Sequence, residues 1–290
     1  MNVLLLSRSK DLYSTSRLFK EAQNAKHCIA VVDYMHCNII NEKKNPVVYF
    51  NGQSLRYIDA IIPRIGATFT FYGSSLIRQF ELQNIPTLVT SQALLKARDK
   101  LHCLQALTQV DVDMPKTYFS NYFYDMDAII TAVGGFPFVM KKLESTHGYG
   151  VFLIRDRKQA SEIIKAHQST NKKFIIQEYI AESKGTDVRA IVIGDKVVAA
   201  MKRNARPDDF RSNLHQGGKG EKVELTEIEI HTAITSAKTM GLSVAGVDML
   251  QSNRGPLVLE VNASPGLEGI EKTTNINVAA KIIKHLEEIK

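Results

Sequence analysis

The chain has 290 residues, of which 44% are hydrophobic and 23% are charged, and its net charge is +7. These values are ordinary for a soluble globular protein, and the length allows two or three domains. The apolar run near the N-terminus, residues 3–6, is too short for a signal peptide or a membrane span, and no later run is long enough.

The positive charge favours anionic ligands, which include nucleotides, acidic peptides and nucleic acids. The basic residues are scattered and lack the aromatic-interleaved stripe that is typical of nucleic-acid binding, so no direct nucleic-acid partner is required. Cys28, Cys37 and Cys103 show no Cys-x-x-Cys spacing. An odd number of cysteines without a metal pattern fits free buried thiols in a reducing cytoplasm.

The first part of the chain alternates short apolar runs with segments of helical spacing. Strands are predicted at 3–6, 29–32, 60–63 and 86–89, and helices at 14–24 and 70–83. Such alternation predicts a small doubly wound α/β domain. No Gly-x-Gly-x-x-Gly follows the first strand, so a dinucleotide site is not supported there.

The rest of the chain mixes strands and helices in a less regular order. Residues 91–109 are predicted as one or two helices, and Asp125 as the N-cap of a helix that ends at Gly134. Further strands are predicted at 136–142, 151–154 and 174–177, a hairpin at 188–202 that turns at Gly194-Asp195, a polar loop at 204–220, and helices at 158–167, 226–240 and 278–286.

Two strand-like runs near the C-terminus carry acidic residues. The runs 244–250 and 256–262 are separated by a predicted turn, and side chains at positions i and i+2 of a strand share a face. Glu260 and Asn262 therefore point the same way, and an antiparallel partner would bring Asp248 beside them. Two carboxylates and an amide oxygen suit Mg²⁺ or Mn²⁺ that also carries phosphate oxygens. The alternative is a solvated polar face of a hairpin, but the abrupt loop after Asn262 favours a functional strand end.

Other residues have the chemistry of a nucleotide site. Lys141 ends a strand before a glycine-containing loop and could reach phosphates as a point charge. The loop is not a Walker A motif, and an ordinary surface loop is the alternative. Glu178 follows another strand and could accept from an adenine amine, or it could be a plain surface acid. Asp187 could accept from ribose hydroxyls.

Two arginines, Arg203 and Arg211, lie near the polar loop and could neutralise charge on a transferred phosphoryl group. His147 and His215 have no partner at metal-ligand spacing, and no catalytic role is expected for either.

Together these pieces resemble one family, the RimK-type ATP-grasp ligases, over essentially the whole chain. The segments that carry the resemblance are 63–66 (Pro-Arg-Ile-Gly), 97–100 (Ala-Arg-Asp-Lys), Lys141, 177–180 (Gln-Glu-Tyr-Ile), 209–215 (Asp-Phe-Arg-Ser-Asn-Leu-His), 245–248 (Ala-Gly-Val-Asp) and 259–274, the last being long and specific. The resemblance implies an α/β (α+β) ATP-grasp fold, in which an N-terminal doubly wound α/β domain precedes two α+β subdomains that clasp ATP. The expected divisions are an N-terminal pre-ATP-grasp domain at 1–94, a central ATP-grasp subdomain at 95–175 and a C-terminal subdomain with the metal site at 176–290.

The resemblance also implies roles for individual residues. The nucleotide phosphates would be held by Lys100 and Lys141. The adenine would be framed by Glu178, Tyr179 and Ile180, and the ribose held by Asp187. The γ-phosphate would be met by Arg203, Arg211 and Asn213, with Ser212 among the nucleotide-binding residues and the two arginines acting in catalysis. Two Mg²⁺ ions, or Mn²⁺, would be held by Asp248, Glu260 and Asn262.

The implied reaction joins glutamate to the C-terminus of a small-subunit ribosomal protein with ATP, by way of an acyl phosphate, and could also make poly-α-glutamate. A RimK-type ligase that adds an amino acid to a small molecule or coenzyme is the alternative within the family. A non-catalytic nucleotide sensor is a rival, although it would not need Asp248, Glu260, Asn262 and Arg211 together. A kinase lacks support because His-Arg-Asp and Asp-Phe-Gly signatures are missing. A cytoplasmic protein without a membrane partner is expected, and a homo-oligomer is left open.

Arg64 follows the third predicted strand of the N-terminal domain. Ligands of open α/β sheets gather beyond the carboxyl ends of the strands, and an arginine can pair with a carboxylate through two parallel hydrogen bonds. We therefore expect Arg64 to help hold an acidic substrate. An arginine that ties the domains together is the alternative.

Overall fold

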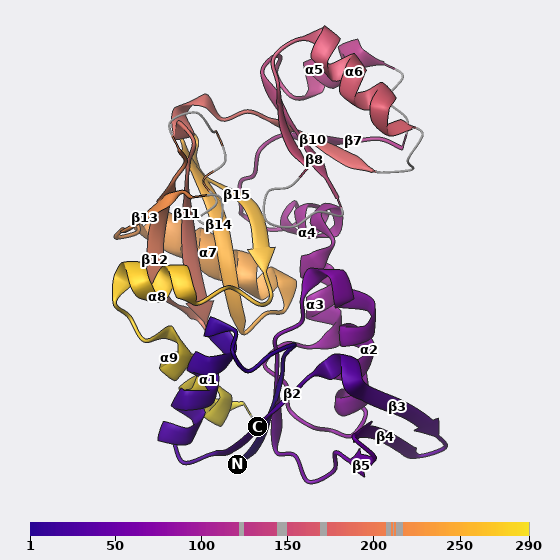
Figure 1. The fold of residues 1–290 in the computed structure, drawn as a ribbon. Coiled ribbons are helices and arrows are strands. Elements are labelled where there is room, and N and C mark those ends of the chain that lie inside the picture. The colour runs from indigo at the N-terminus through magenta and orange to yellow at the C-terminus, as the bar shows by residue number, and fades with distance from the viewer. Residues whose placement is uncertain are drawn as a thin grey trace.

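The computed structural model describes residues 1–121, 125–143, 150–168, 173–206, 210, 212 and 217–289. Figure 1 shows the arrangement of the elements. The N-terminal part contains β1 (Asn2–Leu6), α1 (Tyr13–Asn24), β2 (Cys28–Val32), η1 (Tyr34–His36), β3 (Cys37–Glu42), β4 (Asn45–Phe50), β5 (Gln53–Ser54), β6 (Ala60–Pro63), η2 (Ala67–Phe69), α2 (Thr70–Glu81), α3 (Ser91–Arg98) and α4 (Lys100–Leu107). The middle contains β7 (Thr117–Phe119), α5 (Met126–Ala132), β8 (Phe138–Lys142), β9 (Val151–Ile154), α6 (Arg157–Gln168) and β10 (Phe174–Glu178). The C-terminal part contains η3 (Ala181–Ser183), β11 (Thr186–Ile193), β12 (Lys196–Asn204), β13 (Lys219–Lys222), α7 (Glu227–Met240), β14 (Val244–Ser252), β15 (Gly255–Asn262), α8 (Glu268–Thr274) and α9 (Val278–Glu288).

The N-terminal sheet has the parallel order β2-β1-β6. Strands β1 and β6 are buried apolar runs, as expected where helices cover a parallel sheet. The predicted strand at 86–89 is wrong, because this segment makes only one isolated bridge, between Thr87 and Ile61. Pro86 has no N–H to extend a ladder, although its carbonyl accepts from the Ile61 N–H. A small antiparallel sheet, β3-β4-β5, follows β2 and was not predicted.

Residues 91–107 form two helices because Asp99 separates them. Its backbone is extended, with φ −84° and ψ 102°, and its side chain accepts from the N–H groups of Leu101 and His102. Asp99 thus ends α3 and caps α4, as aspartates at N-caps do. The break places Arg98 and Lys100 on either side of a corner in the chain.

The four-stranded sheet β7-β10-β8-β9 is antiparallel and packs on α5 and α6. It stands apart from the rest at the top of Figure 1. Asp125 caps α5 by accepting from the Ala128 N–H, which confirms the predicted N-cap. The core of this unit is small, and within the described residues it is formed by Ile129, Val133, Phe138, Met140, Ile154, Ala160, Ile164, Phe174 and Ile176.

The five-stranded sheet β13-β12-β11-β14-β15 is antiparallel throughout. The predicted hairpin of β11 and β12 is confirmed, and Gly194 supports its turn at a φ of +60°. β13 was not predicted, and its first two residues lie in the segment interpreted as a polar loop, 204–220. Helix α7, with a capping box between Thr226 and Glu229, packs against β11, β12, β14 and β15.

The two ends of the chain meet, since α9 packs against α1 of the N-terminal part. Apolar residues of the N-terminal and C-terminal parts belong to one continuous core. The sheet of β11–β15 is therefore held firmly against the N-terminal part. Among the helices that the structure describes, none combines the length and the apolar character that a membrane crossing demands.

Candidate active site

The two acidic strands pair as predicted. Asp248 of β14 lies directly opposite Glu260 of β15, and Gly246 lies opposite Asn262. Directly opposed residues share a face, so Asp248, Glu260 and Asn262 project from the same side of the sheet. A register shift between Asp248 and Met249 marks a β-bulge beside these residues, a feature that is frequent next to active sites.

The charged row continues across the next two strands. Arg189 of β11 lies opposite Asp248, Asp187 shares its face two residues earlier, and Arg203 of β12 lies opposite Asp187. The other face of the sheet carries buried apolar residues such as Val188 and Val247. Strand alternation therefore sorts the sheet into a charged face and an apolar face that joins the core with α7.

Asp248 is 3% exposed and accepts from two arginines. Its Oδ1 and Oδ2 lie 2.7 and 2.6 Å from Nε and Nη2 of Arg189, and Oδ2 lies 2.8 Å from Nη2 of Arg203. Burial alone would raise the pKa of Asp248, but the two guanidiniums outweigh it and hold the pKa well below its usual range. The carboxylate is therefore ionised, and both of its oxygens already accept from guanidinium groups.

Asp187 is also buried and engaged. Arg203 donates from Nε and Nη2 to its two oxygens at 2.6 and 2.7 Å, and the Ser212 hydroxyl donates at 2.5 Å. Burial would lower the pKa of Arg203, but Asp248 and Asp187 together raise it. Arg203 thus bridges the residue predicted for the ribose and a residue predicted for the metal.

Glu260 differs from Asp187 and Asp248, because it forms no ion pair with a described residue. The Asn262 Nδ2 donates to its Oε1 at 3.1 Å, which turns the Asn262 carbonyl oxygen away from that contact. The donor set of two carboxylates and an amide oxygen fits a hard cation such as Mg²⁺. Within the described residues, no three His, Cys, Asp or Glu side chains gather as a metal-binding group. A cation would therefore rely on this mixed set and on oxygens from a ligand.

Two lysines face Glu260 from other elements. Lys141 lies on β8, and burial lowers its pKa to about 8 although Glu260 works in the opposite direction. Lys100 begins α4 and donates to the Leu143 carbonyl at 3.0 Å, and burial lowers its pKa too. Two ammonium groups that have lost solvation, on one side of the cavity, suit a polyanion such as a phosphate chain.

The segment predicted to frame an adenine, Glu178–Ile180, leaves the end of β10. Glu178 accepts from the Lys116 N–H at 3.2 Å and from Arg254 Nη2 at 2.8 Å. Arg254 lies in the turn between β14 and β15, so the acidic hairpin also touches this segment. The adjacent Gln177 is buried, and its Oε1 has no hydrogen-bond partner among the described residues.

The residues after Asn262 form a tight loop, 263–267, that the N-terminal part holds. Arg64 Nη2 donates to the Pro265 carbonyl at 2.8 Å, and the Leu267 N–H donates to Ser14 Oγ at 3.0 Å. Pro265 packs so closely that a Cβ on Gly246 would lie 2.8 Å from its Cβ. This close approach requires glycine at position 246.

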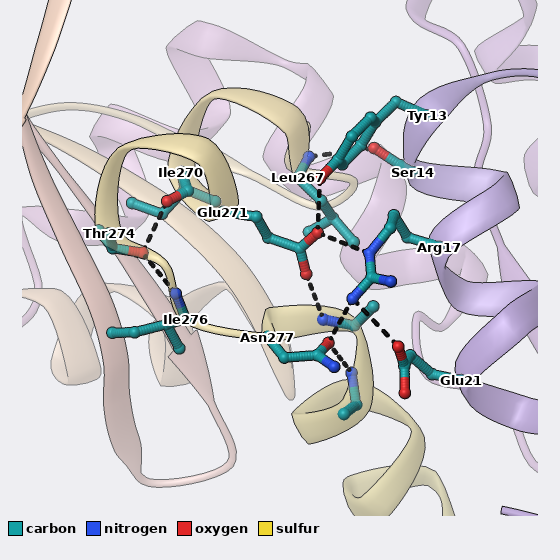
Figure 2. A network of polar contacts seen from close by, with 12 residues as sticks. Tyr13, Ser14, Arg17, Glu21, Leu267, Ile270, Glu271, Thr274, Ile276 and Asn277 are labelled. Atoms are coloured by element: carbon teal, nitrogen blue, oxygen red, sulfur yellow. Dashed lines mark hydrogen bonds and ion pairs between the residues drawn. The ribbon is translucent and has the colours of Figure 1, made fainter. Parts of the chain in front are cut away.

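Helix α8 is fixed by a polar network with α1, shown in Figure 2. Glu271 is 7% exposed and accepts from Tyr13 Oη at 3.1 Å, from Arg17 Nε at 3.0 Å and from the Ala279 N–H at 2.9 Å. Arg17 also donates to Asn277 Oδ1 at 2.9 Å. The network connects α1, α8 and α9, and it supports the loop that follows the acidic strands.

All the predicted site residues that the structure describes line one cavity of about 2330 Å³. They are Arg64, Lys100, Lys141, Glu178, Tyr179, Ile180, Asp187, Arg203, Ser212, Asp248, Glu260 and Asn262. Arg211 and Asn213 lie outside the described residues, as do His147 and His215. Residues from distant parts of the chain thus meet in one place, and their individual roles remain predictions.

Sequence reasoning missed three arginines in this cavity and at its edge. Arg189 could have been found, because it shares a strand face with Asp187 at spacing i+2. Arg98 stood in a segment that carried the family resemblance but received no role. Arg254 offered no signal, since its contact with Glu178 joins residues 76 positions apart.

Known proteins of one family match this chain over nearly its whole length. Residues 97–286 match the RimK-like ATP-grasp domain, and residues 1–94 match the RimK PreATP-grasp domain. A probable alpha-L-glutamate ligase of Picosynechococcus sp. is 50% identical over 287 residues, which cover 99% of this chain and 95% of the relative. Probable alpha-L-glutamate ligase 1 of Shewanella frigidimarina is 49% identical over 287 residues, with the same coverage.

Solved structures share the fold at much lower identity. The ATP-grasp ligase PsnB in complex with a minimal precursor superposes with a TM-score of 0.77 at 18% identity, covering 99% of this chain and 97% of that one. The D-alanine–D-alanine ligase of Bacillus anthracis in complex with ATP gives a TM-score of 0.73 at 17% identity, covering 99% and 96%. At these identities the likeness shows an ATP-grasp fold, as predicted.

Proposed function

This chain belongs to the RimK-like family of ATP-grasp ligases, and on that premise we propose that it adds glutamate to the C-terminus of a small-subunit ribosomal protein. The family makes it an enzyme that uses ATP with Mg²⁺ to form an amide bond, and glutamate is the amino acid named for its relatives. The proposal adds the acceptor, the extension to poly-α-glutamate and the roles of individual residues.

One observation carries the proposal: acidic oxygens and buried cationic groups from different sheets line one cavity. Asp248, Glu260 and Asn262 supply hard oxygen donors from β14 and β15. Lys141 supplies a buried ammonium from a different sheet. A nucleoside triphosphate with its cations would complement this pattern of charges, since the cations would bind the acidic oxygens and the phosphates would bind the ammonium group.

The chemistry requires an activated carboxylate. A carboxylate is a poor electrophile, and transfer of the γ-phosphoryl group of ATP to it forms an acyl phosphate and ADP. The glutamate amine then attacks the carbonyl carbon, the C–N bond forms and phosphate leaves. Electrostatic stabilisation of the transferred group and exclusion of water are the contributions expected of the protein.

We assign the phosphate contacts to Lys100 and Lys141, and charge stabilisation at the γ-phosphate to Arg203 and Arg211, with Asn213 and Ser212 beside them. When bound, Mg²⁺ at Asp248, Glu260 and Asn262 would neutralise phosphate charge, and we propose two ions. Mn²⁺ suits the same oxygens.

The base and the sugar are assigned to other residues that line the same cavity. Glu178, Tyr179 and Ile180 would frame the adenine. Asp187 would accept from the ribose, which would share or replace its contact with the Ser212 hydroxyl. The ion pair between Asp187 and Arg203 would then couple ribose binding to the placement of the catalytic arginine.

The acceptor end of the proposal is supported by the size and charge of the cavity. A volume of about 2330 Å³ exceeds what one nucleotide fills, and small-molecule sites usually measure about 300–1,000 Å³. The chain carries a net charge of +7, which suits an acidic tail that grows by glutamate residues. A peptide acceptor is therefore favoured over a coenzyme or another small molecule.

The test is mass spectrometry of purified small-subunit ribosomal proteins incubated with the enzyme, ATP, Mg²⁺ and glutamate. We expect one acceptor to gain integral numbers of glutamate residue masses at its C-terminus. The Glu260→Gln variant, incubated in parallel, should leave the acceptor unchanged. ADP release that requires glutamate but accompanies no ribosomal product would favour a small acceptor, and ADP release that ignores amino acids would exclude the ligase.

A further inference from the structure

Two arginines on the N-terminal side of the cavity form no ion pair with an acid among the described residues. Arg64, after β6, donates from Nη2 to the Pro265 carbonyl at 2.8 Å. Arg98, at the end of α3, donates from Nη2 to the Ile65 carbonyl at 2.6 Å. No carboxylate in the described part of the chain forms an ion pair with either guanidinium, whereas Arg189 and Arg203 each bind carboxylates.

Further polar atoms around this pair lack a hydrogen-bond partner within the part of the chain that the structure describes. Arg98 Nε and Ser264 Oγ are both sealed from water, and neither forms a hydrogen bond with a described residue. Buried donors normally have a partner, because an unsatisfied polar group that has lost its water destabilises the fold. Arg64, Arg98 and Ser264 all line the cavity, so a ligand there could supply the acceptor that they lack.

The charges around Arg64 and Arg98 also favour an anionic ligand. Burial lowers the pKa of Arg64 to about 10, and the neighbouring Arg98 adds to the effect. The negative charge of Glu260 raises the pKa of Arg98, and it has the same effect on Lys100 and Lys141. The positive charge therefore extends from the acidic strands through Arg98 to Arg64, which forms no ion pair with an acid of the described residues.

We propose that Arg64, Arg98 and Ser264 form a subsite for a substrate carboxylate beside the phosphate end of the cavity. Arg64 and Arg98 together offer several N–H donors, and a carboxylate accepts two of them from a single arginine in parallel. The inference rests on the proposed function, in which both substrates are carboxylates. The source is either the terminal carboxylate of the acceptor chain or a carboxylate of the incoming glutamate.

The experiment measures binding without turnover, by calorimetry in the presence of ADP and Mg²⁺. The probes are triglutamate with a free C-terminus, triglutamate amide and free glutamate. Wild type is compared with Arg64→Met, Arg64→Lys and Ser264→Ala. Arg56→Gln is the control, because it removes one positive charge from an exposed residue of the N-terminal part that does not line the cavity.

We expect wild type and Arg56→Gln to bind free triglutamate at least tenfold more tightly than its amide. Arg64→Met should abolish this preference, and Ser264→Ala should weaken it severalfold while leaving Tm unchanged, since the hydroxyl has no partner to lose. Arg64→Lys keeps the charge and one donor toward Pro265, so it should keep Tm and lose most of the preference, because an ammonium cannot form the two-pronged contact. If glutamate affinity falls instead and the peptide preference stays, the subsite holds the incoming glutamate.

The proposal is overturned if no variant changes the affinity for either acidic probe. It is also overturned if Arg64→Lys and Arg64→Met lose ADP affinity and Tm in parallel with probe affinity, because Arg64 would then only join the loop at 263–267 to β6. The readout does not depend on a ribosomal acceptor. A negative result in the glutamate-transfer assay therefore leaves this test intact.

Discussion

The five-stranded sheet and the four-stranded sheet line one cavity with charges in opposite states. On the five-stranded sheet, Arg189, Arg203, Asp187 and Asp248 neutralise one another through hydrogen bonds of 2.6 to 2.8 Å. On the four-stranded sheet, Lys141 is buried and forms no ion pair with a carboxylate of the described residues, and burial lowers its pKa to about 8. The charges on the five-stranded sheet compensate one another within the protein, whereas a bound anion would compensate the ammonium group of Lys141.

This difference shows how stability and binding are divided in the molecule. A charge that is already paired holds its neighbours in place but has less to gain from a ligand. A charge that is desolvated and unpaired costs stability, and it recovers that cost when a phosphate binds. The large shared core supports the paired surface, and the small separate core carries the unpaired lysine.

The strongest test of the comparison is Asp248→Asn against Glu260→Gln. Both should lower turnover by at least about 100-fold, because each removes a hard oxygen donor with its charge. Only Asp248→Asn should also destabilise the fold, by about 3–5 kcal/mol, since it leaves Arg189 and Arg203 without their shared acid. Turnover and urea unfolding of both variants measure this. Equal destabilisation by the two would contradict the contrast between paired and unpaired acids.

Lys141→Met should move stability and binding in opposite directions. The folded pKa of about 8 lies below the ordinary 10.5, and this difference corresponds to a penalty on the order of 3 kcal/mol at pH 7. Removing the ammonium should raise Tm in the absence of nucleotide and weaken ATP binding by at least about tenfold. Calorimetry and thermal unfolding check both effects. A variant that is less stable than wild type at pH 7 would show that burial of the Lys141 ammonium group does not destabilise the fold.

The lowered pKa of Lys141 makes both the stability of the fold and ATP binding depend on pH. Below pH 8 Lys141 is protonated in both the folded and the unfolded chain, and the full penalty applies. As pH rises from 8 to 10.5, the folded chain releases the proton first, so the contribution of this group to stability increases over that range. ATP binding near pH 9 should therefore take up a proton, visible as a buffer-dependent binding enthalpy. Lys141→Met should remove that dependence.

Glu271→Gln tests whether the network of Figure 2 fixes the loop after the acidic strands. The substitution weakens charged hydrogen bonds from Tyr13 and Arg17, and we expect a loss of about 1–3 kcal/mol. Glu268→Gln is the matched control, because Glu268 lies on the same helix but is exposed. Unfolding curves of the two variants should differ accordingly. Equal stability of both would assign the network no structural weight.

Arg254→Ala should have the smallest effect. The ion pair with Glu178 lies at the surface, where the Arg254 side chain is 45% exposed, so we expect less than about 1 kcal/mol of stability. If Glu178 frames the adenine, KM for ATP should rise a few-fold while kcat holds. A change in kcat without a change in KM would place Glu178 away from the nucleotide base.

Local patterns were sufficient for the parts of the site that lie on neighbouring strands. The antiparallel pairing that puts Asp248 opposite Glu260 follows from two apolar runs and a turn, because alternation fixes which side chains share a face. The N-cap at Asp125 and the hairpin at Gly194 follow from equally local chemistry. The same reasoning was insufficient where one residue decides whether an element forms or ends. Pro86 prevents a predicted strand, and Asp99 divides a segment that was predicted as one or two helices. A single missing N–H or a single cap changes an element without changing its apolar pattern.

The sequence by itself determined the alternation of elements, the acidic strand pair and, through long specific segments, the family. Only the tertiary structure decided which charges are compensated. Arg189 and Arg203 reach Asp248 from other strands, Arg64 reaches Pro265 across 201 positions, and Arg254 reaches Glu178 across 76. Charge compensation depends on distance and burial in the folded chain, and neither quantity is encoded in the local spacing of residues.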